Sequence, residues 1–187
     1  MIVVKLGGGL GNQMFQYALG RHLSIKNESE FFLDPFSYGS TDFVRVYSLG
    51  DFKIAGQLAD YDLVKMFHQK AWRTIFTRRR LKYYREKDLS FDPSILELGE
   101  KSYLSGYWQT ELYFKEIADQ IRKDFTLKKT LPGSVTDLQK EMMSSESVAI
   151  HFRRTDYLSK RVFASMFHQL DDSYYQKALE IILTKNP

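Results

Sequence analysis

A glycine-rich segment near the N-terminus is the first place in the sequence where residue types and spacing point to chemistry. It reads Gly7-Gly8-Gly9-Leu10-Gly11-Asn12-Gln13 and lies between a short apolar run and a helical pattern. Glycines allow a tight turn and a close approach of the backbone to a ligand, and the N-terminus of a helix favours an anion. The segment therefore predicts a phosphate-binding loop, with a purely structural turn as the alternative.

The spacing of these glycines excludes one kind of nucleotide-binding loop and leaves another as an alternative. A Walker loop is excluded because no Gly-Lys-Ser/Thr follows. In the G-x-G-x-x-G pattern of dinucleotide-binding proteins, counted from Gly7 and Gly9, the third glycine would stand at Asn12. Asp34, at the end of the next apolar run, stands where an acidic residue could hold a ribose. An NAD(P)-dependent reductase therefore stays open as an alternative.

A second segment with chemistry is His151-Phe152-Arg153-Arg154-Thr155-Asp156-Tyr157, at the end of the apolar run Val148–Phe152. In open α/β sheets, ligands bind at the carboxyl ends of the strands. Arg153 and Arg154 offer permanently charged, bidentate donors for a phosphate, and Asp156 could neutralise or orient one of them. The segment predicts an anion site, with an exposed ion-pair cluster as the alternative.

Two other groups of charged residues carry weaker signals. Asp60-Tyr61-Asp62 has the spacing of a metal-binding pair of carboxylates, but it begins a helical pattern, where acidic residues are routine, so no metal site is expected. Most of the net charge of +4 comes from Arg78, Arg79, Arg80, Lys82 and their neighbours. A solvated helix end is the first interpretation of this basic segment. Contact with an anionic membrane surface or with RNA is the alternative, although the net charge is too small to argue for nucleic acid by itself.

Composition limits the class of protein. The 187 residues include 43% hydrophobic residues, 14 Phe and 12 Tyr, which is enough apolar material for a packed core. The absence of cysteine rules out disulfides and thiolate metal sites. No stretch approaches the roughly 18 apolar residues of a membrane span, and the N-terminus does not resemble a signal peptide. Composition thus predicts a soluble, cytoplasmic protein.

Periodicity predicts alternating strands and helices, and hence an α/β fold with a largely parallel sheet. Leu131-Pro132-Gly133-Ser134 is the clearest break in the pattern. We expect an N-terminal α/β domain at 1–145 and the start of a second α/β domain at 146–187. The alternative is that this last strand and helix complete the sheet of the first domain. The expected strands are 2–6, 31–33, 103–108 and 148–152, and the expected helices cover 14–23, 63–75, 114–125 and 175–182.

Three segments together resemble the bacterial α1,2-fucosyltransferases, which belong to the glycosyltransferase-B superfamily. They are Gly8–Ala18, Leu104–Gln109 with Tyr113-Phe114 after it, and His151–Tyr157. Their order and separation fit the family along essentially the whole chain. Two features depart from the family: Thr155 stands where a glycine is usual, and family members continue well beyond residue 187. The resemblance thus implies a glycosyltransferase-B-like fold whose second, donor-binding domain is incomplete here.

The resemblance also implies a function. It implies transfer of fucose from GDP-fucose to a galactose-containing acceptor, with inversion and without a metal or other cofactor. Arg153 would stabilise charge on the departing GDP, which is the role of preorganised cationic donors in catalysis. Asn12 and the glycine-rich loop would approach the pyrophosphate or the fucose. The implied catalytic residues are Arg153 and Asn12, and the implied donor-binding residues are Gly9, Gly11, Asn12, His151, Arg153, Arg154 and Asp156.

Overall fold

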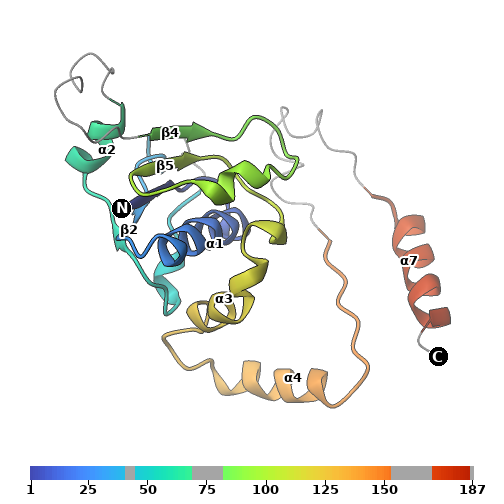
Figure 1. Cartoon of the computed structure of the whole chain (residues 1–187). Helices are drawn as coiled ribbons and strands as arrows, with labels where there is room; N and C mark the ends of the chain where they lie inside the picture. Colours follow the sequence, from blue (N-terminus) through green and yellow to red (C-terminus); the bar gives the residue numbers. More distant parts are fainter. Residues whose placement is uncertain (41–44, 69–81, 153–169, 186–187) are drawn as a thin grey trace. The chain divides into compact units, whose positions relative to one another are not determined.

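A computed structural model describes residues 1–40, 45–68, 82–152 and 170–185 (Figure 1). The chain divides into two compact units, Met1–Thr130 and Leu131–Pro187. The division falls at the Pro-Gly break identified in the sequence, 15 residues before the predicted boundary at 145. Each unit is described by itself.

The first unit is built on a parallel sheet of five strands in the order β3-β2-β1-β5-β4. Val3 of the central strand β1 pairs with Phe32 of β2 on one side and with Tyr103 of β5 on the other. The prediction of an α/β fold with a largely parallel sheet is confirmed. The strands are β1 (Ile2–Lys5), β2 (Phe31–Asp34), β3 (Gln57–Leu58), β4 (Lys82–Arg85) and β5 (Ser102–Ser105).

Helices connect these strands and cover the sheet. The longest, α1 (Leu10–Lys26), connects β1 to β2 and packs against both (Figure 1). The helix predicted at 114–125 is divided, because a 3₁₀ turn precedes its α-helical part. The other helices are α2 (Tyr61–His68) and α3 (Ala118–Asp124), and the 3₁₀ turns are η1 (Leu49–Asp51), η3 (Pro93–Glu97), η4 (Glu111–Tyr113) and η5 (Lys115–Ile117).

Alternation along β1 divides the core between the two faces of the sheet. Ile2 and Val4 belong to the larger cluster, which includes the apolar side of α1. Val3 belongs to a second cluster that contains Phe67 of α2 and Tyr103 of β5. All three β1 residues are fully buried. This double burial explains why β1 reads as a continuous apolar run rather than an alternating one.

The second unit contains α4 (Gly133–Met143) and α7 (Asp172–Lys185), and α7 confirms the last predicted helix. The strand predicted at Val148–Phe152 is wrong, because these residues are extended but pair with no strand in the described part of the chain. Val148, Ile150 and Phe152 are exposed. An apolar run becomes a strand only where a neighbouring strand satisfies its backbone groups, and sequence pattern does not reveal that neighbour.

No helix within the described residues is long and apolar enough to cross a membrane. Lys82, the last residue of the predicted membrane-contact group, is exposed and begins β4, so Lys82–Arg85 form a strand where a solvated helix end was expected. Arg78, Arg79 and Arg80 lie outside the described residues. Contact of this basic segment with a membrane stays a prediction.

Two buried phenols predict that the free energy of unfolding falls in alkaline solution. Tyr17 donates a 2.6 Å hydrogen bond to Asp124, and Tyr103 donates one to Asp34. Burial, reinforced by the neighbouring carboxylate, raises the pKa of both phenols above the ordinary value of 10.0. The folded state therefore holds these protons to higher pH than the unfolded state. Their stabilisation is fully present below pH 10 and is lost as the pH rises above it.

Urea unfolding at pH 8, 10 and 11 measures this loss. Each phenol contributes up to about 1.4 kcal/mol per pH unit above pH 10. Tyr103→Phe should be less stable than the wild type at pH 8, because Asp34 loses a donor, but its stability should fall less steeply between pH 10 and 11. Equal slopes in the two proteins would show that Tyr103 ionises alike in the folded and unfolded states.

Candidate functional site

The strand order creates a switch point between β1 and β5. From β1 the chain moves outward through β2 to β3, and it then returns on the opposite side of β1 through β4 and β5. In open parallel sheets, ligands bind outside the carboxyl ends of the strands at such a point. The two loops that begin there are the glycine-rich loop after β1 and residues 106–109 after β5.

The glycine-rich loop leaves open space beside its backbone. Gly8 has φ +75°, a left-handed conformation that glycine adopts without strain. Gly9 is the N-cap of α1, and no side chain caps the helix at this position. Apart from the adjacent residues and the backbone of α1 itself, a Cβ atom at Gly9 or at Gly11 would meet no atom of the described chain within 4 Å. The helix N-terminus thus offers backbone N–H groups beside unfilled space, an arrangement that favours a bound anion.

Gln16 joins the two loops across the switch point. Its Oε1 accepts a 3.0 Å hydrogen bond from the backbone N–H of Gly7, and its Nε2 donates a 2.9 Å bond to the carbonyl of Gly106. The side chain is 2% exposed. Gln16 therefore fixes the distance between the end of β1 and the end of β5.

A second and more exposed hydrogen bond also joins the glycine-rich loop side to the loop after β5. Gln109 Nε2 donates a 2.6 Å hydrogen bond to Asn12 Oδ1. The Asn12 side chain lies directly over Gly8, so closely that a Cβ at Gly8 would collide with it. Asn12 therefore presents its amide between the glycine-rich loop and the loop after β5, where a ligand bound at the switch point could contact it.

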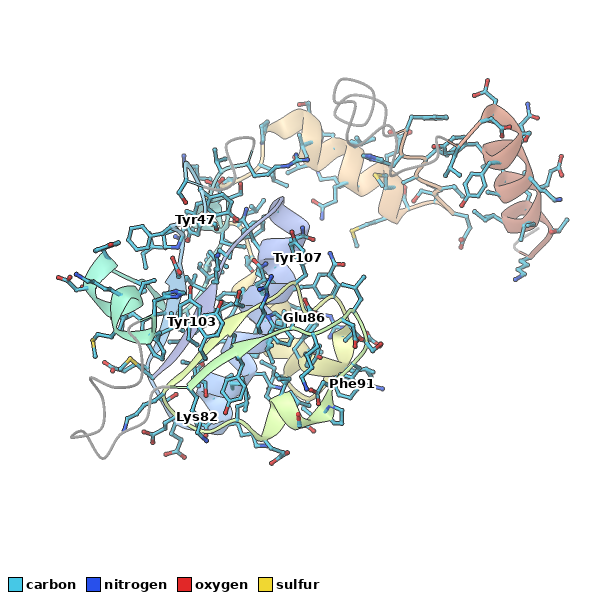
Figure 2. The ribbon with its side chains drawn as sticks, turned by 90° about the horizontal axis from the view of Figure 1, so that it is seen from above. Tyr47, Lys82, Glu86, Phe91, Tyr103 and Tyr107 are labelled. Atoms are coloured by element: carbon cyan, nitrogen blue, oxygen red, sulfur yellow. The ribbon has the colours of Figure 1, made fainter. Side chains whose placement is uncertain are left out.

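Glu86, directly after β4, holds the loop that follows β5. Its carboxylate accepts backbone hydrogen bonds from Tyr107 at 2.6 Å and from Trp108 at 2.9 Å. Trp108 has φ +57°, so the chain turns sharply at this residue. Gly106 allows the close approach, since a Cβ there would lie within 3.0 Å of Glu86 and Trp108. Figure 2 shows Glu86 and Tyr107 close together in this region.

Buried Gln13 shapes another side of the site. Its Nε2 donates to the carbonyl of Val46 at 2.9 Å, and its Oε1 accepts from the N–H of Ser48 at 2.8 Å. These bonds hold the segment before η1 against the start of α1.

Sequence reasoning assigned no role to Gln13, Gln16, Glu86 or Gln109. Two glutamines on the buried side of an apolar helix were the available signal.

The structure brings together one part of the predicted site. Gly9, Gly11 and Asn12 lie at the switch point. His151 lies in the second unit, where it is exposed. Arg153, Arg154 and Asp156 lie outside the described residues, as does Thr155. Their roles stay predictions.

Asp34 and Asp60, which the sequence offered as ribose-binding and metal-binding candidates, have structural roles instead. Asp34 is 2% exposed, and its side chain accepts hydrogen bonds from Tyr103 and, at 2.8 Å, from the backbone N–H of Phe36. Both carboxylate oxygens of Asp34 thus already accept hydrogen bonds from the protein, which leaves Asp34 unsuited to hold a ribose. This weakens the reductase alternative. Asp60 accepts a 2.7 Å bond from the N–H of Leu63 and so caps α2. The described residues contain no group of three or more His, Asp or Glu side chains that could hold a metal ion.

The sequence of the chain is similar to that of a known protein family and of one of its relatives. The family described as "Glycosyl transferase family 11" matches residues 1–186. An "Alpha-1,2-colitosyltransferase" of Escherichia coli is 30% identical over 186 residues, an alignment that covers 94% of this chain and 61% of the relative. The chain thus spans about three-fifths of the length of that relative. No solved structure matches the chain.

Proposed function

The chain belongs to glycosyl transferase family 11, and on this premise we propose that it carries part of the donor site of a nucleotide-sugar-dependent glycosyltransferase. The observation that supports the proposal most strongly is the open glycine-rich loop, which Gln16 holds at a fixed distance from the loop after β5. This pair of loops suits a phosphate at the start of α1 and a sugar near Asn12.

We further propose GDP-fucose as the donor, a galactose-containing glycan as the acceptor, and transfer with inversion and without a metal. Cleavage of the sugar–phosphate bond builds negative charge on the departing nucleotide. The N-terminus of α1 offers backbone donors for that charge, and Arg153, with Arg154 and Asp156 beside it in sequence, would supply a guanidinium. The donor sugar needs a direct test, because the E. coli relative is named for colitose rather than fucose.

Calorimetric titration of the chain with GDP-fucose, with NADH as the competing ligand, tests the donor. Binding of GDP-fucose that NADH does not displace would support the transferase. Binding of NADH in place of GDP-fucose would favour the reductase alternative. A folded chain that binds neither would contradict a donor site within these 187 residues.

Arg153→Ala should weaken binding of GDP-fucose by about 1.5–3 kcal/mol, because one charge-assisted hydrogen bond to the donor is lost. Calorimetry measures the change. Arg122→Ala is the matched control, since Arg122 is an exposed residue of α3 that pairs with Asp119 at 2.7 Å. The control should bind as the wild type does. An unchanged affinity in Arg153→Ala would remove Arg153 from the donor site.

A further inference from the structure

A hollow of about 430 Å³ lies beside β4. Its walls come from residues between 84 and 98 and from Trp108 and Tyr113. The volume lies within the range of small-molecule binding sites. The hollow shares Glu86 and Trp108 with the loop after β5, so its occupant would be a neighbour of that loop.

Aromatic rings form the inner wall of the hollow. Tyr113 packs against Phe91 with ring centroids 4.9 Å apart and against Trp108 at 5.6 Å, and the rings of Trp108 and Tyr113 are perpendicular. The Tyr113 hydroxyl accepts a 2.9 Å hydrogen bond from the backbone N–H of Asp92, which ties the segment before η3 to this cluster. Rings that are held in this way give a preformed apolar surface.

Charged residues of both signs also belong to the lining, together with serines and aliphatic residues, and their balance disfavours a phosphate. Glu86, Asp88 and Asp92 line the same hollow as Arg85 and Lys87. Three acidic groups against two basic ones disfavour an anion. Aromatic surface surrounded by polar groups of both signs suits a neutral molecule that carries many hydroxyl groups.

One buried polar atom in this wall lacks a partner. The indole N–H of Trp108 makes no hydrogen bond within the described part of the chain, and the residue is 1% exposed. Indole nitrogen is a donor only, and an unmade bond at a buried donor costs about 1–3 kcal/mol. A ligand oxygen that reached this N–H after a small shift of the wall would remove that cost.

We propose that the hollow binds a neutral sugar ring of the acceptor glycan, with a hydroxyl oxygen accepting from Trp108 Nε1. The inference rests on the proposed glycosyl transfer for the identity of the sugar as an acceptor. The placement follows from the shared loop: Gly106 is bonded to Gln16, Gln109 to Asn12, and Trp108 lies between them in sequence. An acceptor in the hollow would thus lie next to a donor bound at the switch point.

Tryptophan fluorescence of the full chain tests the hollow. The chain has two tryptophans, Trp72 and Trp108, so Trp72→Phe leaves Trp108 as the reporter. We expect lactose or methyl β-galactoside to change the Trp108 emission saturably. In this background Ser90→Phe places a ring at the wall of the hollow and should weaken sugar binding at least tenfold. Thr126→Phe, at an exposed position outside the hollow, should leave it unchanged.

The outcomes separate this proposal from the proposed donor. No saturable change with either sugar in a chain that circular dichroism shows to be folded would overturn the hollow as a sugar site. Equal binding in Ser90→Phe would overturn its location. Because the titration contains no nucleotide, sugar binding without GDP-fucose binding would support the hollow and count against the donor. The reverse result would overturn the hollow alone.

Discussion

Replacement of Gln16 by leucine should destabilise the first unit by roughly 2–6 kcal/mol and abolish binding of the donor at the switch point. Leucine has a similar size but makes no hydrogen bond. The N–H of Gly7 and the carbonyl of Gly106 would both lose the partners that they have in the wild type. Each unsatisfied buried group costs about 1–3 kcal/mol. Because the same side chain sets the distance between the two loops, donor binding should be lost together with stability. Urea unfolding and GDP-fucose calorimetry measure the two effects.

Gln109→Leu is the matched control for this change. Gln109 also bridges the two loops, through a 2.6 Å bond to Asn12, but it is exposed, so water can replace the lost partner. Its substitution should cost no more than about 1 kcal/mol of stability. If Gln16→Leu were as stable as Gln109→Leu, the buried bridge would not be what holds the loops together.

Local pattern predicted β1, β2 and β5 of the parallel sheet and missed β3 and β4. Ile2–Lys5 and Phe31–Asp34 are short apolar runs that end at glycine or at Asp-Pro, and both are strands. The same pattern failed at Val148–Phe152, where β-forming residues have no neighbouring strand in the described chain. A strand depends on a partner that is distant in sequence, and periodicity carries no information about that partner.

The candidate site was predictable only in part for a similar reason. Glycines before a helix reveal a tight turn locally, so Gly9, Gly11 and Asn12 could be selected from the sequence. Gln16 and Glu86 act on residues 90 and 21–22 positions away, respectively, and these pairings exist only after β1, β4 and β5 lie side by side. Asp34 shows the converse, since a position typical of ribose binding is used here to hold Tyr103.

Two alanine substitutions in the same helix should have opposite effects on stability. Gly20 lies where α1 packs against the sheet, and a Cβ there would come within 3.0 Å of Val4 and Phe31, which are buried. Such overpacking costs about 1–3 kcal/mol. A Cβ at Gly11 would meet nothing within 4 Å, and alanine is a better helix residue than glycine by up to about 1 kcal/mol. Urea unfolding should therefore separate Gly20→Ala from Gly11→Ala by roughly 1–4 kcal/mol.

The affinity for GDP-fucose should also differ between Gly11→Ala and Gly20→Ala. If the glycine-rich loop contacts the donor, the methyl group of Gly11→Ala fills space that the ligand needs, and GDP-fucose should bind at least tenfold more weakly to a protein that is as stable as the wild type or more so. Gly20→Ala should lose affinity only in proportion to the fraction that unfolds. Unchanged affinity in Gly11→Ala would show that the donor does not approach this glycine, and that the space beside it has a different use.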